Sequence, residues 1–90
     1  MVRSFRSKGL RLYWQSGDPL RLSVPNERRV RQILLALNAA TRPEDLNLPG
    51  LRFHGLHGSP KRWAVSASGN WRITWAWAEG PVDVDLEDYH

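Results

Sequence analysis

The sequence predicts an α+β domain in which two N-terminal helices pack on one face of an antiparallel sheet of four to five strands. Apolar residues recur at helical spacing in the first half of the chain, and they alternate with polar residues in the second half. Helical patterns followed by a run of strand patterns are typical of the α+β class. The 90 residues hold no internal repeat, so we expect one domain spanning residues 1–90.

The N-terminal half contains one short and one longer helical pattern. A short strand is predicted over residues 2–5, followed by a helix over residues 8–15 with apolar side chains three and four positions apart. The second helix is predicted over residues 25–40, because Pro25 suits a first helical turn. Its apolar stripe consists of Val30, Ile33, Leu34 and Leu37. One further short turn is expected at residues 43–45.

The C-terminal half has the alternation of a strand meander. Strands are predicted over residues 51–56, 62–68, 71–78 and 82–86, separated by turns rich in glycine and proline. The Gly69-Asn70 pair is a connection typical of a hairpin.

The strand at residues 71–78 has the clearest alternation of the four. One of its faces carries Trp71, Ile73, Trp75 and Trp77. We expect this row to face the helices, which places Arg72 on the opposite, open face of the sheet. The last strand is expected to present Val82, Val84 and Leu86 on one face and Asp83 and Asp85 on the other.

Composition limits the kinds of chemistry that are available. The chain has no cysteine, which excludes disulfides, cysteine-based zinc sites and a thiol nucleophile. The absence of cysteine fits a reducing cytoplasm, and we find no signal-peptide pattern. The longest apolar stretches, such as residues 33–37, are too short to span a membrane. We therefore expect a cytoplasmic protein, and no ligand spacing indicates a metal or another cofactor.

Charge is divided unevenly along the chain. Residues 1–78 hold all 13 lysines and arginines against four acidic residues, a balance of +9, whereas residues 79–90 hold five acidic residues and carry −5. A basic body suits RNA or DNA. It equally suits an acidic protein partner or a solvated surface, so charge alone leaves these readings open.

Three histidines offer proton-transfer groups for RNA cleavage without a metal: His54, His57 and His90. In that reaction a base takes the 2′-OH proton, a cation stabilises the phosphate charge, and an acid protonates the leaving 5′-oxygen. Histidine suits either transfer role near neutral pH. These groups would converge around Arg72 if the first and last strands of the meander approach one another on the open face. Taken singly, each of them has an ordinary structural role open to it.

Four strings resemble HigB-type toxins of the RelE/ParE superfamily, in the same order and over nearly the whole chain. They are Val2-Arg3-Ser4-Phe5-Arg6-Ser7-Lys8-Gly9-Leu10, Pro43-Glu44-Asp45-Leu46-Asn47-Leu48-Pro49-Gly50 with the following Arg52-Phe53-His54, Ser68-Gly69-Asn70-Trp71-Arg72-Ile73-Thr74, and Asp83-Val84-Asp85-Leu86-Glu87-Asp88-Tyr89-His90.

The resemblance implies a RelE-like fold and a ribosome-dependent endoribonuclease that cleaves mRNA. It also implies a helix-turn-helix antitoxin of the HigA type, and a toxin–antitoxin complex that binds its own promoter DNA. By motif, His54 matches a proton-transfer histidine and Arg72 matches the phosphate-binding arginine. The residues Asp88, Tyr89 and His90 match the terminal catalytic triplet, with His90 and Asp88 as proton-transfer or orienting groups and Tyr89 stacking on or orienting a base.

One position departs from the pattern of the resembling family. Many relatives carry lysine where this chain has His57, and a histidine is only partly charged near neutral pH. Lys61 or Arg62 in the following turn would supply the missing charge, or His57 itself takes part in proton transfer. We expect activity to persist and to depend more on Arg72.

Two other functions remain open at this stage. One is a ParE-like gyrase poison that acts by binding without catalysis, and the other is a degenerate domain that retains only antitoxin and DNA-complex roles. The C-terminal triplet and His54 argue against both, because neither function needs proton-transfer groups.

Overall fold

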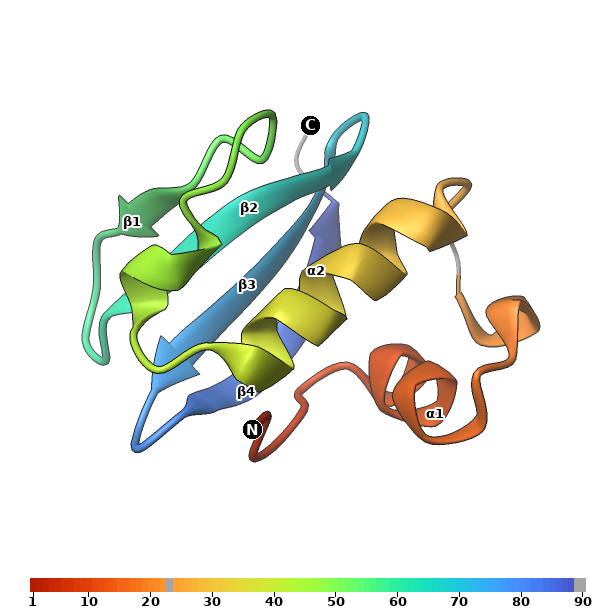
Figure 1. The fold of residues 1–90 in the computed structure, drawn as a ribbon, viewed down its shortest axis with the longest axis horizontal. Helices are drawn as coiled ribbons and strands as arrows, with labels where there is room; N and C mark the ends of the chain where they lie inside the picture. The colour runs from red at the N-terminus through yellow and green to blue at the C-terminus, as the bar shows by residue number, and fades with distance from the viewer. Residues whose placement is uncertain (23, 89–90) are drawn as a thin grey trace.

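The computed structural model describes residues 1–22 and 24–88. Within these residues, helices precede four strands that form one antiparallel sheet in the order β1-β2-β3-β4 (Figure 1). The elements are α1 (Lys8–Ser16), η1 (Pro19–Arg21), α2 (Glu27–Ala39), η2 (Pro43–Leu46), β1 (His54–Leu56), β2 (Arg62–Ser68), β3 (Trp71–Trp77) and β4 (Pro81–Asp88), where η marks a 3-10 helix. The predicted α+β class, with helices before strands, is confirmed.

Polar caps set the ends of the two α-helices. Ser7 caps the start of α1 through its hydroxyl, and Gly17, in the left-handed region at a φ of 73°, closes that helix. The Asn26 side chain accepts a backbone N–H from the first turn of α2. The helix therefore begins at Glu27, two residues after the predicted start at Pro25.

The core lies between α2 and one face of the sheet, which α2 crosses in Figure 1. The predicted stripe of α2 is buried, and Ile73 and Trp75 of β3 are buried in the same cluster. Trp71 and Trp77 are partly buried and pack against it. The predicted orientation of the β3 tryptophan row is therefore confirmed, and Arg72 lies on the other face.

The first strand of the predicted meander is shorter in the structure than in the prediction. The strand β1 covers His54–Leu56, whereas a strand over residues 51–56 was expected. Arg52 has a φ of 54°, in the left-handed region, and a residue with that backbone does not continue a strand. The turn before it is closed by a hydrogen bond from Leu51 N–H to the carbonyl of Leu48, at 3.2 Å.

The predicted strand over residues 2–5 is wrong. The N-terminal segment lies beside the outer edge of β4 and forms one isolated parallel bridge, between Phe5 and Val84. Backbone bonds on either side of that bridge, such as Arg3 N–H to the carbonyl of Pro81 at 2.8 Å, hold the segment in place. The segment covers a strand edge that would otherwise expose unpaired backbone groups.

A bulge in β4 changes which of its residues share a face. The register pairs Thr74 with Asp85 but Ala76 with Val82. Two residues of β4 therefore lie opposite the single residue Trp75 of β3. Asp83, with a φ of 50°, lies in this bulge. The expectation that Val82, Val84 and Leu86 share a face is wrong for Val82, which is paired with Ala76 on the face opposite the helices.

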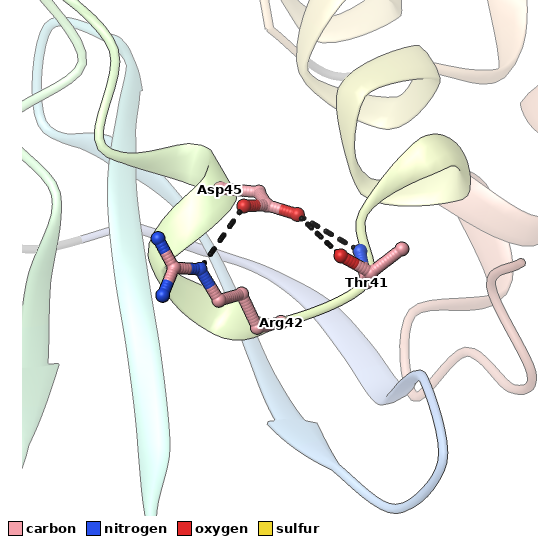
Figure 2. Close-up of polar contacts among 3 residues, drawn as sticks. All are labelled: Thr41, Arg42 and Asp45. Atoms are coloured by element: carbon pink, nitrogen blue, oxygen red, sulfur yellow. Dashed lines mark hydrogen bonds and ion pairs between the residues drawn. The ribbon is translucent and has the colours of Figure 1, made fainter.

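The connection from α2 to the sheet is held by the carboxylate of Asp45, shown in Figure 2. This carboxylate accepts the Thr41 backbone N–H at 2.9 Å and the Thr41 hydroxyl at 3.2 Å, and it pairs with Arg42 Nε at 3.4 Å. The backbone bond from Thr41 is the main cause that lowers the pKa of Asp45. The short turn expected at residues 43–45 is confirmed as η2.

Arg29 fastens α2 to the sheet. Its Nε donates to the carbonyl of Ser66 at 3.2 Å, and its guanidinium also donates to the carbonyl of Gly50. One of the basic side chains in the N-terminal half therefore has a structural role. Across the described residues, every helix is too short or too polar to cross a bilayer.

Candidate active site on the open face of the sheet

A polar pocket of about 230 Å³ opens on the face of the sheet opposite α2. The described residues that line it are Arg52, His54, Ser66, Gly69, Asn70 and Arg72. They come from the segment before β1, from β1, β2 and β3, and from the hairpin between β2 and β3. Two of the residues expected to carry chemistry, His54 and Arg72, therefore share one pocket.

His54 and Arg72 are in direct contact. The Arg72 guanidinium Nη1 lies 3.3 Å from His54 Nε2, and the other ring nitrogen, Nδ1, lies 2.8 Å from the carbonyl oxygen of Arg52. Both side chains are half-buried. The histidine ring is thus held at both of its nitrogens, with one edge directed at the guanidinium.

Small residues on β2 allow Arg72 to reach across the sheet. The strands β1 and β3 lie on either side of β2, and neighbouring strands are about 4.8 Å apart. Cross-strand pairing places Ala64 beside His54 and Ser66 beside Arg72. Neither side chain is large enough to fill the space between β1 and β3, so the long arginine side chain bridges it above β2.

A second polar group lies farther along the same face. Arg62 on β2 donates to the Thr74 hydroxyl and to the carbonyl of Asp83, both at 2.9 Å. The Thr74 hydroxyl in turn donates to the carboxylate of Glu87. Thr74 is fully buried, so the charged side chains around it cover this part of the sheet. We call Arg62, Thr74 and Glu87 the buried polar cluster.

Burial and neighbouring charges act on the pKa of Arg62 in this cluster. Burial lowers the pKa of the Arg62 guanidinium, and the Arg6 guanidinium lowers it further. The nearby carboxylates, Glu87 first among them, act in the opposite direction. Arg62 Nη1 is buried and finds no hydrogen-bond partner among the described residues.

His57 and Lys61 lie in the exposed connection between β1 and β2. The Lys61 ammonium lies 6.0 Å from the centre of the Trp63 ring, a cation–π distance. His57, Lys61 and Arg62 are absent from the described residues that line the pocket. The structure thus separates these three candidates from His54 and Arg72.

The C-terminal triplet is described in part. Asp88 is exposed at the end of β4. In the strand register Asp88 lies opposite Trp71 of β3, and its neighbour Glu87 lies opposite Arg72. Tyr89 and His90 lie outside the described residues. Within residues 1–22 and 24–88, no three His, Asp or Glu side chains gather as a metal-binding group.

Sequence reasoning missed four described residues of the pocket: Arg52, Ser66, Gly69 and Asn70. One signal for Ser66 was present, because the residues between Trp63, Val65 and Ala67 must point away from the core. Arg52 was missed because it was placed inside a strand. Glu87 and Thr74 carry no sequence signal of their own, since Glu87 directly precedes the resembling triplet and Thr74 lies on the side of β3 opposite its tryptophan row.

Comparison with known proteins identifies the family of the chain. The family model for the RelE-like toxin of the type II toxin-antitoxin system HigB matches residues 3–90. The chain is also 32% identical over 92 residues to a protein of Proteus vulgaris named Endoribonuclease HigB, and the match covers 100% of both chains. Membership in such a system also means that the toxin has an antitoxin partner. The chain belongs to the HigB-like family of RelE-like toxins from type II toxin-antitoxin systems.

Proposed function

We propose that this toxin is a ribosome-dependent endoribonuclease, an mRNA interferase that cleaves translated mRNA by attack of a 2′-OH on the adjacent phosphate. Family membership and the relative named Endoribonuclease HigB support this proposal. The observation that carries it is the contact between His54 and Arg72 at 3.3 Å in a polar pocket. A proton-transfer group and a fixed cation side by side are two of the three parts that metal-free RNA cleavage needs.

The pocket suits one phosphodiester and its ribose. Its volume, about 230 Å³, lies below the range of about 300–1,000 Å³ that is common for small-molecule sites. Arg72 binds the phosphate oxygens and stabilises the charge that builds up in the transition state. His54, held against Arg72, exchanges a proton with the ribose or the phosphate. The rest of the mRNA must be held elsewhere, which fits a toxin that acts on mRNA positioned by the ribosome.

The third part, the group at the leaving 5′-oxygen, comes from the C-terminal triplet in this proposal. His90 transfers the second proton, Tyr89 stacks on or orients a base, and Asp88 orients the two. Cleavage forms the bond between the 2′-oxygen and phosphorus and breaks the bond between phosphorus and the 5′-oxygen. The products are a 2′,3′-cyclic phosphate and a 5′-hydroxyl end.

Arg72 is the main phosphate-binding cation in this account. Arg62 is held by Thr74 and by the backbone of Asp83, so its guanidinium is engaged in the sheet. His57 and Lys61 are exposed in the β1–β2 connection, outside the described lining of the pocket. We propose that they assist binding of the RNA and that Arg72 carries the catalytic charge.

The partners follow from the same proposal. The antitoxin is a helix-turn-helix protein of the HigA type, and the complex of toxin and antitoxin binds its own promoter DNA. The toxin acts in the cytoplasm, on ribosomes that are translating mRNA. The +9 balance of residues 1–78 supports contact with ribosomal RNA.

The test is to map mRNA 5′ ends in cells after the toxin is induced. Wild type should produce new 5′ ends inside translated reading frames, and His54→Ala, Arg72→Ala and His90→Ala should produce none above background. Glu79→Ala, an exposed change in the turn between β3 and β4, is the matched control and should cleave like wild type. Identical cleavage by wild type and His90→Ala would overturn the role of the triplet. Growth arrest with DNA breaks and intact mRNA would instead point to a gyrase poison.

A further inference from the structure

His54 has a defined partner at each ring nitrogen, and the chemistry of the two partners fixes the proton. Nδ1 lies 2.8 Å from the carbonyl oxygen of Arg52, and Nε2 lies 3.3 Å from the guanidinium of Arg72. A carbonyl oxygen can only accept a hydrogen bond, and a guanidinium can only donate one. Only one tautomer of the neutral ring satisfies both partners, the one with the hydrogen on Nδ1 and the lone pair on Nε2.

We propose that the backbone of Arg52 is a positioning device that holds His54 in the Nδ1–H tautomer and thereby makes His54 the general base of the cleavage. The inference rests on the proposed function, in which His54 transfers a proton at the ribose and phosphate. It also says which way the proton moves. The nitrogen that faces Arg72 and the pocket, Nε2, carries a lone pair, so His54 accepts the proton. The acid that protonates the leaving 5′-oxygen is then a different group.

The conformation of Arg52 explains how its carbonyl reaches the ring. In a strand, carbonyls point along the sheet toward neighbouring strands, and the side chain two residues later lies on the sheet face. Leu51, which precedes Arg52, follows the strand pattern, since its carbonyl accepts Ser66 N–H at 2.7 Å. Arg52, with a φ of 54°, breaks that pattern, and its carbonyl turns to the Nδ1 edge of His54. Few residues other than glycine adopt this backbone conformation, and it is costly to hold.

The contact with Arg72 keeps the base ready for substrate. A phosphate competes for the guanidinium, because hydrogen bonds between two charged groups are stronger than one to a neutral imidazole. When Arg72 turns to the phosphate, the lone pair on Nε2 becomes available to the 2′-OH. The 2′-OH proton moves to Nε2, the freed electron pair forms the bond to phosphorus, and the bond from phosphorus to the 5′-oxygen breaks. The imidazolium keeps its Nδ1–H bond to the Arg52 carbonyl, which stabilises the new positive charge.

Nitrogen NMR on the free toxin measures the tautomer directly. Long-range correlations in the ¹⁵N-labelled protein, assigned by the loss of signals in His54→Gln, should show a protonated Nδ1 and an unprotonated Nε2 for His54. A neutral ring protonated at Nε2 would overturn the inference. The spectrum does not depend on cleavage, so the two proposals can fail separately. If the proposed function is wrong and this inference is right, the toxin shows the expected tautomer but cleaves no mRNA.

A matched pair of substitutions separates the backbone of Arg52 from its side chain. Both Arg52→Asn and Arg52→Val remove the guanidinium, but asparagine tolerates the left-handed region and a β-branched valine does not. We expect Arg52→Asn to retain the Nδ1–H tautomer. We expect Arg52→Val to lose it and to cleave at least about tenfold more slowly than Arg52→Asn, since a well-placed base contributes about 10²–10⁴-fold.

Glu79 supplies the control for strain alone. It has a φ of 57° in the turn between β3 and β4, so Glu79→Val imposes a similar backbone conflict outside the pocket. It should lower the melting temperature and leave the His54 tautomer and the cleavage rate per folded molecule unchanged. Equal cleavage by Arg52→Asn and Arg52→Val would overturn the positioning role. Where Arg52→Val is too unstable to assay, the wild-type NMR spectrum still tests the tautomer on which the inference rests.

Discussion

Two arginines on the same face of the sheet have different surroundings. Arg72 lines a pocket and contacts His54, whereas Arg62 is bonded to a buried threonine and to a backbone carbonyl. Both are half-buried, and both lie on the face opposite the helices. Residue type and face therefore do not separate the arginine that we propose binds the substrate phosphate from the arginine that is bonded within the sheet. The partners separate them, because Arg62 would have to give up its bonds to the Thr74 hydroxyl and the Asp83 carbonyl in order to turn to a substrate phosphate.

The largest expected effect is the difference between removing the two charges. Arg72→Met should lower mRNA cleavage by about 10²–10³-fold, the usual loss when a donor to the transition state is removed. Arg62→Met should leave cleavage per folded molecule within about threefold of wild type. It should cost about 1–3 kcal/mol of unfolding free energy, because the Thr74 hydroxyl and the Asp83 carbonyl lose a charged donor.

Cleavage on purified ribosomes and urea unfolding measure the two properties separately. Arg72→Lys is the matched variant, since it keeps the charge and loses the planar pair of donors, and it should recover part of the activity. The comparison fails if Arg62→Met abolishes cleavage while its unfolding free energy is unchanged.

The next effect concerns Tyr13, which lies in the helical layer away from the sheet face. Its hydroxyl donates to the Glu27 carboxylate, and burial, followed by Glu27, raises the Tyr13 pKa from 10.0 to about 12. The folded state thus holds the phenol proton more tightly than the unfolded state. Its contribution is fully present below pH 10 and is lost as the pH rises through about 12, at about 1.4 kcal/mol per pKa unit.

Unfolding at a series of alkaline pH values tests this expectation. Wild type should lose stability between pH 10 and 12, and Tyr13→Phe should lose less over the same interval. Ultraviolet titration of the phenols should show one component near 12 that is missing in Tyr13→Phe. A wild-type titration without that component would contradict the assignment.

A moderate effect is expected from Thr74→Val in the buried polar cluster. The substitution keeps the volume but removes the hydroxyl that joins Arg62 to Glu87. Leaving these charged groups short of a partner should cost about 1–3 kcal/mol in urea unfolding. Thr41→Val is the control, because Thr41 donates to Asp45 in an exposed turn, where the loss should stay below about 0.5 kcal/mol. Equal costs for the two variants would show that the cluster contributes no more than a surface contact.

The smallest effect is expected from His57→Lys. His57 is exposed on the β1–β2 connection and is absent from the described lining of the pocket. A permanent cation there should raise cleavage by no more than about threefold, because exposed charges are screened by salt. Rates on purified ribosomes at two salt concentrations measure this change. A severe loss of cleavage in His57→Lys would give His57 a role of its own.

Much of the fold could be predicted from the sequence, because it is decided by hydrophobic patterns that extend over a whole helix or strand. The stripe of α2 and the tryptophan row of β3 each bury one face of an element, and both expectations are confirmed. The missed features are single backbone conformations. The left-handed Arg52 shortens β1, and the bulge at Asp83 moves Val82 to the other face. Nothing in a two-residue alternation reveals a non-glycine residue with positive φ.

The contact at the candidate site arises in a different way from the one expected. The histidines were expected to converge on Arg72 if the first and last strands of the meander approach one another. Those strands, β1 and β4, lie at opposite edges of the sheet, and His54 on β1 instead contacts Arg72 on β3 across β2. The exclusion of Arg62 from the pocket lining depends on Thr74 and on the Asp83 carbonyl, which are 12 and 21 residues away in the chain. Such long-range partners come from strand register, which the sequence leaves open until the bulges are known.

A double-mutant cycle on His54 and Arg72 tests the central claim most directly. The measured quantity is the single-turnover rate of mRNA cleavage on purified ribosomes, for wild type, His54→Ala, Arg72→Ala and the double variant. Residues that act as one unit are not additive, so the double variant should be about as slow as the slower single variant. A cleavage rate near that of wild type in either single variant would contradict the claim that this pair forms the catalytic centre.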